Sequence, residues 1–440
     1  MQGNRRVLYV ASAQHAPTPA AQVVADVTAP AAGEREQLRG LTALRFLAAA
    51  IIVVLHTRGA FGFPADWGGL FQFSQAVPFF FILSGFILTY VYQDLDEAGT
   101  RRYLVARWAR LWPAHAATLL LTVLLFWLQL YPLLPGDTVP AALANLVMVH
   151  AWVPYADSYF SFNSPSWSIS NELAFYLLFP LLIWKWKQTW HVKLALAFAI
   201  RAGMGLLADS LNLPPFQLLQ PGLDLPGLLS VSPLTNLHLF VLGMTSFLAW
   251  QALVPKLHLN TATATLLELA TLGFTAWALA TPLSVWGAVT QVVSGLSPAI
   301  TIVRWVDVSL TIVAFVVLIV VMALGQGLIS RVLTFAPFVL LGEISYAIYL
   351  MHVPVKIAFF SVDPYLASIP DPAVWAIFWL IVLVAAWGLW WFVERPARRL
   401  IRSWYLKHEH TRSDGQWRVV GTVVACVMLL IFALHILTLR

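Results

Sequence analysis

Residues 41–57 read LTALRFLAAAIIVVLHT, an apolar run with two ionisable side chains, Arg45 near its start and His56 near its end. Its length and composition approach the roughly 20 residues of a transmembrane helix. At about 100° per helical residue, Arg45 and His56 lie on one face, about 16 Å apart along the axis. Because such groups usually face a bundle interior or a wet cavity, the pair indicates a functional site. The alternative is that each side chain extends to its nearer membrane interface.

The whole chain repeats this apolar pattern. Hydrophobic residues make up 60% of the 440 residues and charged residues 10%, which is far outside the balance of soluble domains. Apolar runs recur from Leu41 to Leu439, and 20 Trp and 12 Tyr suit aromatic belts at both membrane interfaces. Since the runs are long and continuously apolar, they predict an all-α polytopic bundle rather than a membrane β-barrel.

The apolar runs predict ten or eleven spans with a cytoplasmic N-terminus. They lie at 41–57, 77–93, 113–131, 172–187, 194–208, 234–252, 263–282, 305–324, 335–359, 373–393 and 418–438. This arrangement places 20 of the 26 Lys and Arg in inner loops and 3 outside. Such an asymmetry is what the positive-inside rule expects.

The basic residues therefore report membrane topology, although a pI near 9.5 can also indicate nucleic-acid binding. We predict no nucleic-acid partner. The single cysteine, Cys426, excludes an intrachain disulfide and a cysteine-based metal site. The 11 histidines are dispersed and form no ligand-spaced cluster with carboxylates, so we predict no metal.

The predicted bundle divides the chain into four parts. These are a disordered Ala/Pro-rich cytoplasmic lead, the transmembrane domain, a basic cytoplasmic loop and an additional C-terminal transmembrane helix, at 1–38, 39–402, 403–417 and 418–438. Two stretches fit less well. Residues 141–171 predict an outward-facing loop with a partly inserted helix that lines a cavity. Residues 284–300 predict a short or re-entrant segment.

Polar groups also gather where spans reach the cytosol. Arg107 and Arg110, three residues apart, share a helix face, and guanidinium forks bind phosphate bidentately. They are candidates to hold a phosphorylated ligand, although most such arginines simply set topology and contact anionic lipid. Glu394 and Arg395 also lie where a span reaches the cytosol. We predict that they anchor the topology and, in addition, stabilise the inner mouth of the bundle.

Two further segments place polar side chains at membrane depth. Residues 164–172 read SPSWSISNE, and Glu172 is either part of a capped interfacial helix end or a carboxylate that orients His56 from the outer side. In residues 341–354, LGEISYAIYLMHVP, a polar stripe recurs at helical spacing and continues to Lys356. The stripe predicts a cavity lining, with internal packing as the alternative.

Taken together, these segments resemble the acyltransferase-3 family of membrane-bound acyltransferases. The likeness covers residues 38 to 402. It is carried in order by residues 41–56, 78–86 (PFFFILSGF), Arg107 with Arg110, 167–172 (WSISNE) with Tyr176 and Pro180, 342–352, and 394–396 (ERP). Many members carry a C-terminal hydrolase-like domain, whereas this sequence predicts a stand-alone form.

The resemblance implies a bacterial inner-membrane enzyme that moves an acyl group from cytosolic acyl-CoA to a hydroxyl of an exported or cell-surface glycan. We expect acetyl-CoA as the first candidate donor, with membrane lipid and polysaccharide-assembly proteins as neighbours. The implied catalytic residues are His56 and Glu172, and the implied donor contacts are Arg45, Arg107 and Arg110. The expected channel residues are Ser84, Trp167, Tyr176, Ser345, Tyr346, Tyr349 and His352.

The side chains accommodate this chemistry. An imidazole with an unperturbed pKa of about 6.5 can take a proton from an acceptor hydroxyl, so His56 is the expected general base. A covalent acyl-histidine is the other route. Alternative functions are transfer of succinyl or another acyl group to a lipid, antibiotic or small molecule, and a proton-coupled transporter or exporter. The sequence shows no convincing internal repeat, which disfavours a transporter built from duplicated halves.

Overall fold

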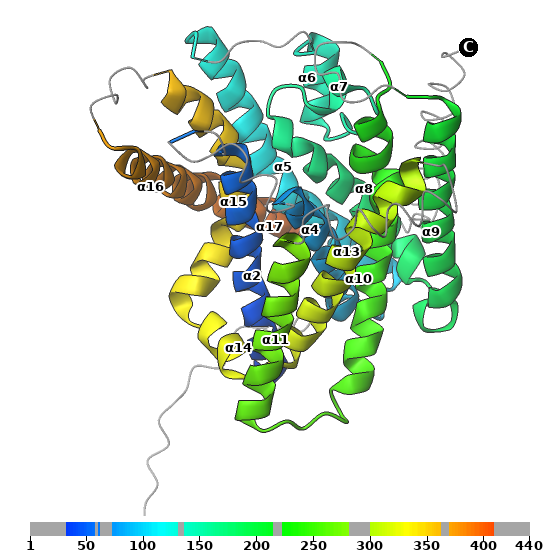
Figure 1. The fold of residues 1–440 in the computed structure, drawn as a ribbon. Helices are drawn as coiled ribbons and strands as arrows, with labels where there is room; N and C mark the ends of the chain where they lie inside the picture. The colour runs from blue at the N-terminus through cyan, green and yellow to red at the C-terminus, as the bar shows by residue number, and fades with distance from the viewer. Residues whose placement is uncertain are drawn as a thin grey trace, which may run out of the picture.

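The structure is a computed structural model that describes residues 32–57, 60–61, 73–130, 136–213, 222–280, 300–361 and 369–408. These residues form a bundle of long helices, with α9 and α16 at opposite sides of the view in Figure 1. One isolated β-bridge, between Tyr155 and Leu223, joins two loops within the described part of the chain.

Among the described residues, ten apolar helices build the bundle. They are α2 (Ala32–Thr57), α4 (Ala76–Val91), α5 (Glu97–Trp127), α8 (Trp167–Ile183), α9 (Trp186–Ser210), α10 (Pro233–Leu253), α11 (Thr261–Ala280), α13 (Ile300–Leu324), α15 (Ala336–Phe360) and α16 (Asp371–Leu389). Within the described residues, eight helical stretches are long and apolar enough to cross a membrane, and α4 and residues 309–324 are shorter apolar helices. The predicted all-α polytopic bundle is confirmed.

Shorter helices connect or extend the long ones. They are η1 (Phe73–Gln75), α6 (Val139–Leu146), α7 (Ala156–Tyr159), η2 (Ser164–Ser166), the π-helical turns η3 (Gly227–Val231) and η5 (Trp390–Glu394), α14 (Leu328–Leu333) and α17 (Arg395–His408). The predicted loop at 141–171 covers most of α6, all of α7 and η2, and the start of α8, where Ser168 and Ile169 line a cavity.

Helix boundaries differ from the hydropathy boundaries because hydrogen bonding continues past the apolar run. Helix α2 begins at Ala32, so the end of the predicted lead is helical. Helix α17 continues through residue 408, into the predicted basic loop. Residues 1–31, most of 284–300, and the predicted span at 418–438 lie outside the described residues.

Close contacts between backbones fix the helices that carry the site. A Cβ added at Gly342 of α15 would lie 2.0 Å from the carbonyl oxygen of Thr42 on α2. A Cβ added at Gly243 of α10 would lie 1.9 Å from the carbonyl oxygen of Ile82 on α4. Small residues let membrane helices approach this closely. The first contact sets how the polar stripe of α15 lies against Arg45 and His56 on α2.

Candidate active site

Two histidines meet where α2 and α15 run side by side. His56 Nδ1 lies 2.7 Å from His352 Nε2, and the rings stack with centroids 5.0 Å apart at an interplanar angle of 10°. His352 is fully buried. The Lys356 ammonium, one turn beyond His352, donates to the carbonyl oxygen of His56 at 2.5 Å. Helix α15 therefore holds both the ring and the backbone of His56.

The backbone of α15 determines which nitrogen of each ring carries a proton. His352 Nδ1 lies 2.7 Å from the carbonyl oxygen of Tyr349, and a carbonyl can only accept. His352 Nδ1 is thus the donor, and in neutral His352 the Nε2 atom accepts a hydrogen bond from His56 Nδ1. The basic nitrogen of neutral His56 is then Nε2, which is the geometry that a general base needs.

A cavity lies between α2, α4, α5, α8 and α15, below this histidine pair. The space between its side chains is about 690 Å³, a volume that includes the part open to the outside. Its polar lining consists of Arg45, Ser84, Arg107, Ser168, Glu172, Tyr176, Ser345, Tyr346 and Tyr349. The structure therefore brings together eight of the residues predicted for the site, and Ser168 joins them.

Glu172 is oriented by two hydroxyl groups inside the cavity. It accepts hydrogen bonds from Ser84 on α4, at 3.4 Å, and from Tyr176 on its own helix. One of the two predictions for Glu172 was that it orients His56, but the ring that meets His56 in the structure is that of His352. The reason is that α8 begins at Trp167, so Glu172 lies inside the helix rather than at its outer end.

Arg45 and Arg107 bring positive charge into the cavity. The Arg107 guanidinium lies over the rings of Tyr92 and Tyr176, 5.8 Å from each centroid. The Nε atoms of Arg45 and Arg107 are buried and make no hydrogen bond within the described part of the chain. Neither arginine forms an ion pair there, so both suit an anionic ligand.

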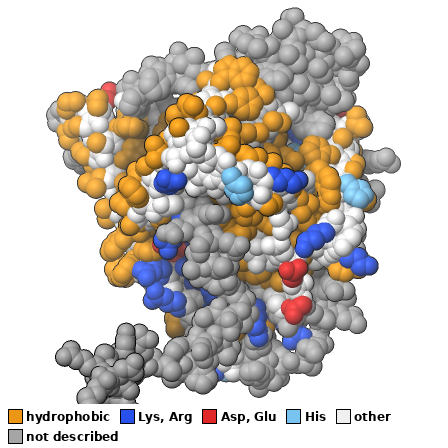
Figure 2. All heavy atoms as spheres, turned by 90° about the horizontal axis from the view of Figure 1, so that it is seen from below, with side chains coloured by type: hydrophobic (Ala, Val, Ile, Leu, Met, Phe, Trp, Pro, Cys, Tyr) orange, Lys and Arg blue, Asp and Glu red, His pale blue; other side chains and the backbone are white. Residues whose placement is uncertain are grey.

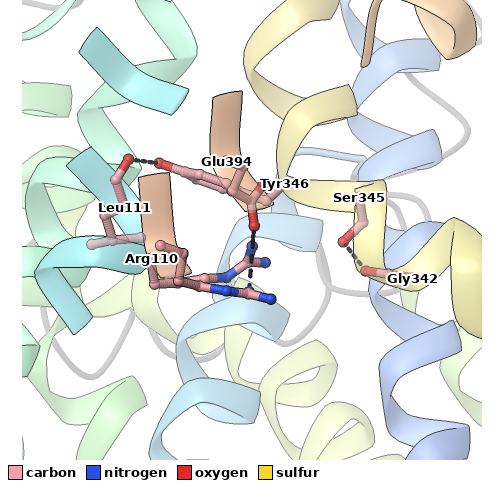
Figure 3. Close-up of polar contacts among 7 residues, drawn as sticks. Arg110, Leu111, Gly342, Ser345, Tyr346 and Glu394 are labelled. Atoms are coloured by element: carbon pink, nitrogen blue, oxygen red, sulfur yellow. Dashed lines mark hydrogen bonds and ion pairs between the residues drawn. The ribbon is translucent and has the colours of Figure 1, made fainter. Parts of the chain in front are cut away.

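Arg110 lies in a different environment, although the sequence pairs it with Arg107. Its guanidinium forms an ion pair with the fully buried Glu394 of η5 and packs over the ring of Tyr346, 5.1 Å from the centroid (Figure 3). Tyr346 in turn donates to the carbonyl oxygen of Leu111 at 2.8 Å. The two arginines that were predicted to hold one phosphorylated ligand therefore lie in different places. Arg107 is in the cavity, and Arg110 is in a contact between α5 and η5.

Other predicted residues lie around the cavity. Trp167, at the start of α8, packs edge-on against Phe81, and Arg395 lies over the rings of Trp390 and Trp391. The Ser345 hydroxyl faces back to its own helix and donates to the carbonyl oxygen of Gly342 at 2.7 Å (Figure 3). Trp167 and Arg395 are outside the cavity lining, as are His56, His352, Arg110 and Glu394.

Tyr349 connects the cavity to the histidine pair. Its hydroxyl is 2.8 Å from Ser168 Oγ and donates to the carbonyl oxygen of Pro165 at 2.9 Å. Its own carbonyl holds His352 one helical turn farther along α15. The pairing of His56 with His352 was not predicted, although the sequence places both residues towards the outer ends of their spans. The described residues contain no cluster of three or more metal-ligating side chains.

Comparison with known proteins points to one class of enzyme. A family model described as an acyltransferase domain matches residues 38–394. The curated protein acyltransferase MdmB of Streptomyces mycarofaciens is 36% identical over 152 residues, which make up 33% of this chain and 39% of that protein. This chain thus matches about two fifths of the relative's length. No solved structure gives a significant match.

Proposed function

The chain belongs to the acyltransferase-3 family, and from this premise we propose that it moves an acetyl group from cytosolic acetyl-CoA to a hydroxyl of an exported or cell-surface glycan. Its apolar helices and its family make it a multi-pass membrane acyltransferase. The observation that carries the proposal is the histidine pair, which lies one helical turn beyond a cavity with two arginines that form no ion pair with any described residue.

The donor occupies the cavity in this proposal. Arg45 and Arg107 attract the anionic coenzyme, and its extended pantetheine arm runs along α2 towards His56. Glu172 holds Ser84 and Tyr176 in place and is a counter-charge to Arg107 while the cavity is empty of donor. Phe80 and Tyr349 both line the cavity, and their rings meet edge to face with centroids 6.2 Å apart.

His56 acts as the general base in this mechanism. Its Nε2 takes the proton of the acceptor hydroxyl as the hydroxyl oxygen attacks the thioester carbonyl carbon. The tetrahedral intermediate then expels the coenzyme thiolate, which receives that proton from the imidazolium. The products are the acetyl ester and free coenzyme A. His352 keeps the proton on His56 Nδ1 throughout and so holds the ring in the productive tautomer.

The acceptor and the cellular setting belong to the same proposal. We place the protein in a bacterial inner membrane, where the donor is supplied from the cytosol and the glycan is met at the outer face. The relative's name supports acyl transfer and does not name an acceptor. Polysaccharide-assembly proteins are the expected partners that present the glycan.

Mass spectrometry of surface polysaccharide tests this proposal directly. Glycan from cells that express the chain should carry hydroxyl-linked acetyl groups that are absent from cells without it. Cells with His56→Ala should match cells without the protein. A mass gain of a succinyl group would revise the donor, and an unchanged glycan together with an acylated lipid or small molecule would revise the acceptor.

A further inference from the structure

A row of arginines on α17 is not explained by the mechanism above. At about 100° per residue, Arg395, Arg398, Arg399 and Arg402 lie within an arc of about 100° on this helix, and we call them the arginine arc. Helix α17 contains no acidic residue and has no buried residue. Leu400 and Trp404 point to another side and are exposed. The helix therefore presents a basic face and an apolar face, as interfacial helices do.

The arginine arc is fixed beside the cavity rather than free to move. Helix α17 packs against α5, which carries Arg107. The Arg398 guanidinium lies 3.7 Å from the Glu394 carboxylate, which also pairs with Arg110. Arg398 is also within electrostatic range of Arg107, Arg395 and Arg402. One buried carboxylate thus ties the first turn of α17 to the helix that lines the cavity.

Positive charge in this region exceeds the nearby negative charge. Glu394 is shared between two guanidinium groups, and Glu343 is the other carboxylate within electrostatic range of Arg398. Figure 2 shows Lys and Arg side chains exposed on the face seen from below, with few acidic side chains among them. Clustered arginines with so few counter-charges are suited to phosphate, because their planar guanidinium groups donate two hydrogen bonds at once to phosphate oxygens.

We propose that the arginine arc binds the nucleotide end of the coenzyme donor, with Arg398 and Arg402 contacting its 3′-phosphomonoester. This inference rests on the proposed function. Phosphate groups are strongly hydrated, so in this proposal they stay at the arginine arc, which packs on the helix that carries Arg107, while the uncharged arm continues past Arg107 into the cavity. Arg398 and Arg402 are one helical turn apart and can share one phosphate.

A comparison of coenzyme A with 3′-dephospho-coenzyme A tests the assignment. The full-length protein is placed in nanodiscs of neutral phosphatidylcholine, and the Kd of each ligand is measured by titration calorimetry. The wild-type chain should bind coenzyme A about tenfold or more tightly than the dephospho form, because charge-assisted hydrogen bonds are lost with the phosphate. Arg402→Gln should weaken coenzyme A binding and leave the dephospho Kd unchanged, so the ratio falls towards one.

The matched control is Lys407→Gln, which removes an exposed positive charge from α17 outside the arginine arc. It should preserve the ratio. A ratio unchanged in both Arg398→Gln and Arg402→Gln would overturn the inference while leaving the proposed function intact. An effect seen only in nanodiscs that contain phosphatidylglycerol would also overturn it, because the arc would then bind lipid phosphate. Failure of the wild-type chain to bind either ligand would overturn both proposals.

Discussion

His56 and His352 are 296 positions apart in the chain, and their ring nitrogens lie 2.7 Å apart in the structure. The contact is directional, because His352 Nδ1 is committed to the carbonyl oxygen of Tyr349. His352 is therefore a positioning residue for His56 in the proposed mechanism. Its removal should change the chemical step more than the binding of the donor.

We expect His352→Phe to lower kcat about 10- to 100-fold with little change in the KM for acetyl-CoA, because the loss falls on orientation of the base. His352→Gln should retain more activity, since its amide oxygen can still accept from His56 Nδ1. Steady-state kinetics with both variants measures this. Nitrogen-15 NMR of labelled histidine should show a loss of the single His56 tautomer in His352→Phe. A rise in KM with unchanged kcat would contradict this role.

Arg107→Gln and Arg110→Gln should differ, although the two arginines are three residues apart. Loss of Arg107 should raise the KM for the donor and leave thermal stability near that of the wild type, because the side chain faces the cavity. Loss of Arg110 leaves the carboxylate of Glu394 buried without its closest partner, and breaking such a pair costs about 3–5 kcal/mol.

Thermal unfolding in detergent measures the second effect. Arg110→Leu should lower the Tm clearly, and adding Glu394→Leu should restore much of that loss, since no buried charge then remains. Equal Tm values for Arg107→Gln and Arg110→Gln would show that the ion pair contributes no more to stability than an arginine without an ion pair does.

Gly342 is predicted to control the distance between the two histidines. An alanine Cβ there would lie 2.0 Å from the carbonyl oxygen of Thr42, so Gly342→Ala must push α15 away from α2. We expect a loss of about 1–3 kcal/mol of stability, typical of overpacking, and a fall in kcat of about tenfold. Gly388→Ala on α16 is the matched control, because no atom lies within 4 Å of its added Cβ. Full activity in Gly342→Ala would show that the histidine contact tolerates a shifted α15.

The fold was largely predictable because hydropathy reports membrane helices directly. All ten predicted spans between residues 41 and 393 fall on helices of the structure, and the family resemblance was confirmed by the match to residues 38–394. Helix ends were less predictable. The start of α8 at Trp167 moves Glu172 into the helix, and this shift separates it from His56.

Contacts within the site depended on packing that spacing does not reveal. Their spacing places Arg107 and Arg110 on one helix face, yet only Arg110 forms an ion pair with Glu394 among the described residues. Glu394 lies on η5, which is far from both arginines in the sequence. The pairing of His56 with His352 depends on how closely α15 approaches α2, which is fixed by Gly342. These are relations between helices, so a one-dimensional pattern predicts the residues and not their partners.

If His56 is the general base, its loss must abolish transfer from radiolabelled acetyl-CoA by purified protein in nanodiscs supplied with acceptor glycan. His56→Ala should lose about 100-fold or more of the transfer rate while keeping its Tm and its affinity for coenzyme A. His258→Ala, which changes an exposed histidine in the connection between α10 and α11, should behave as the wild-type chain does. Full transferase activity in a folded His56→Ala protein would contradict the account.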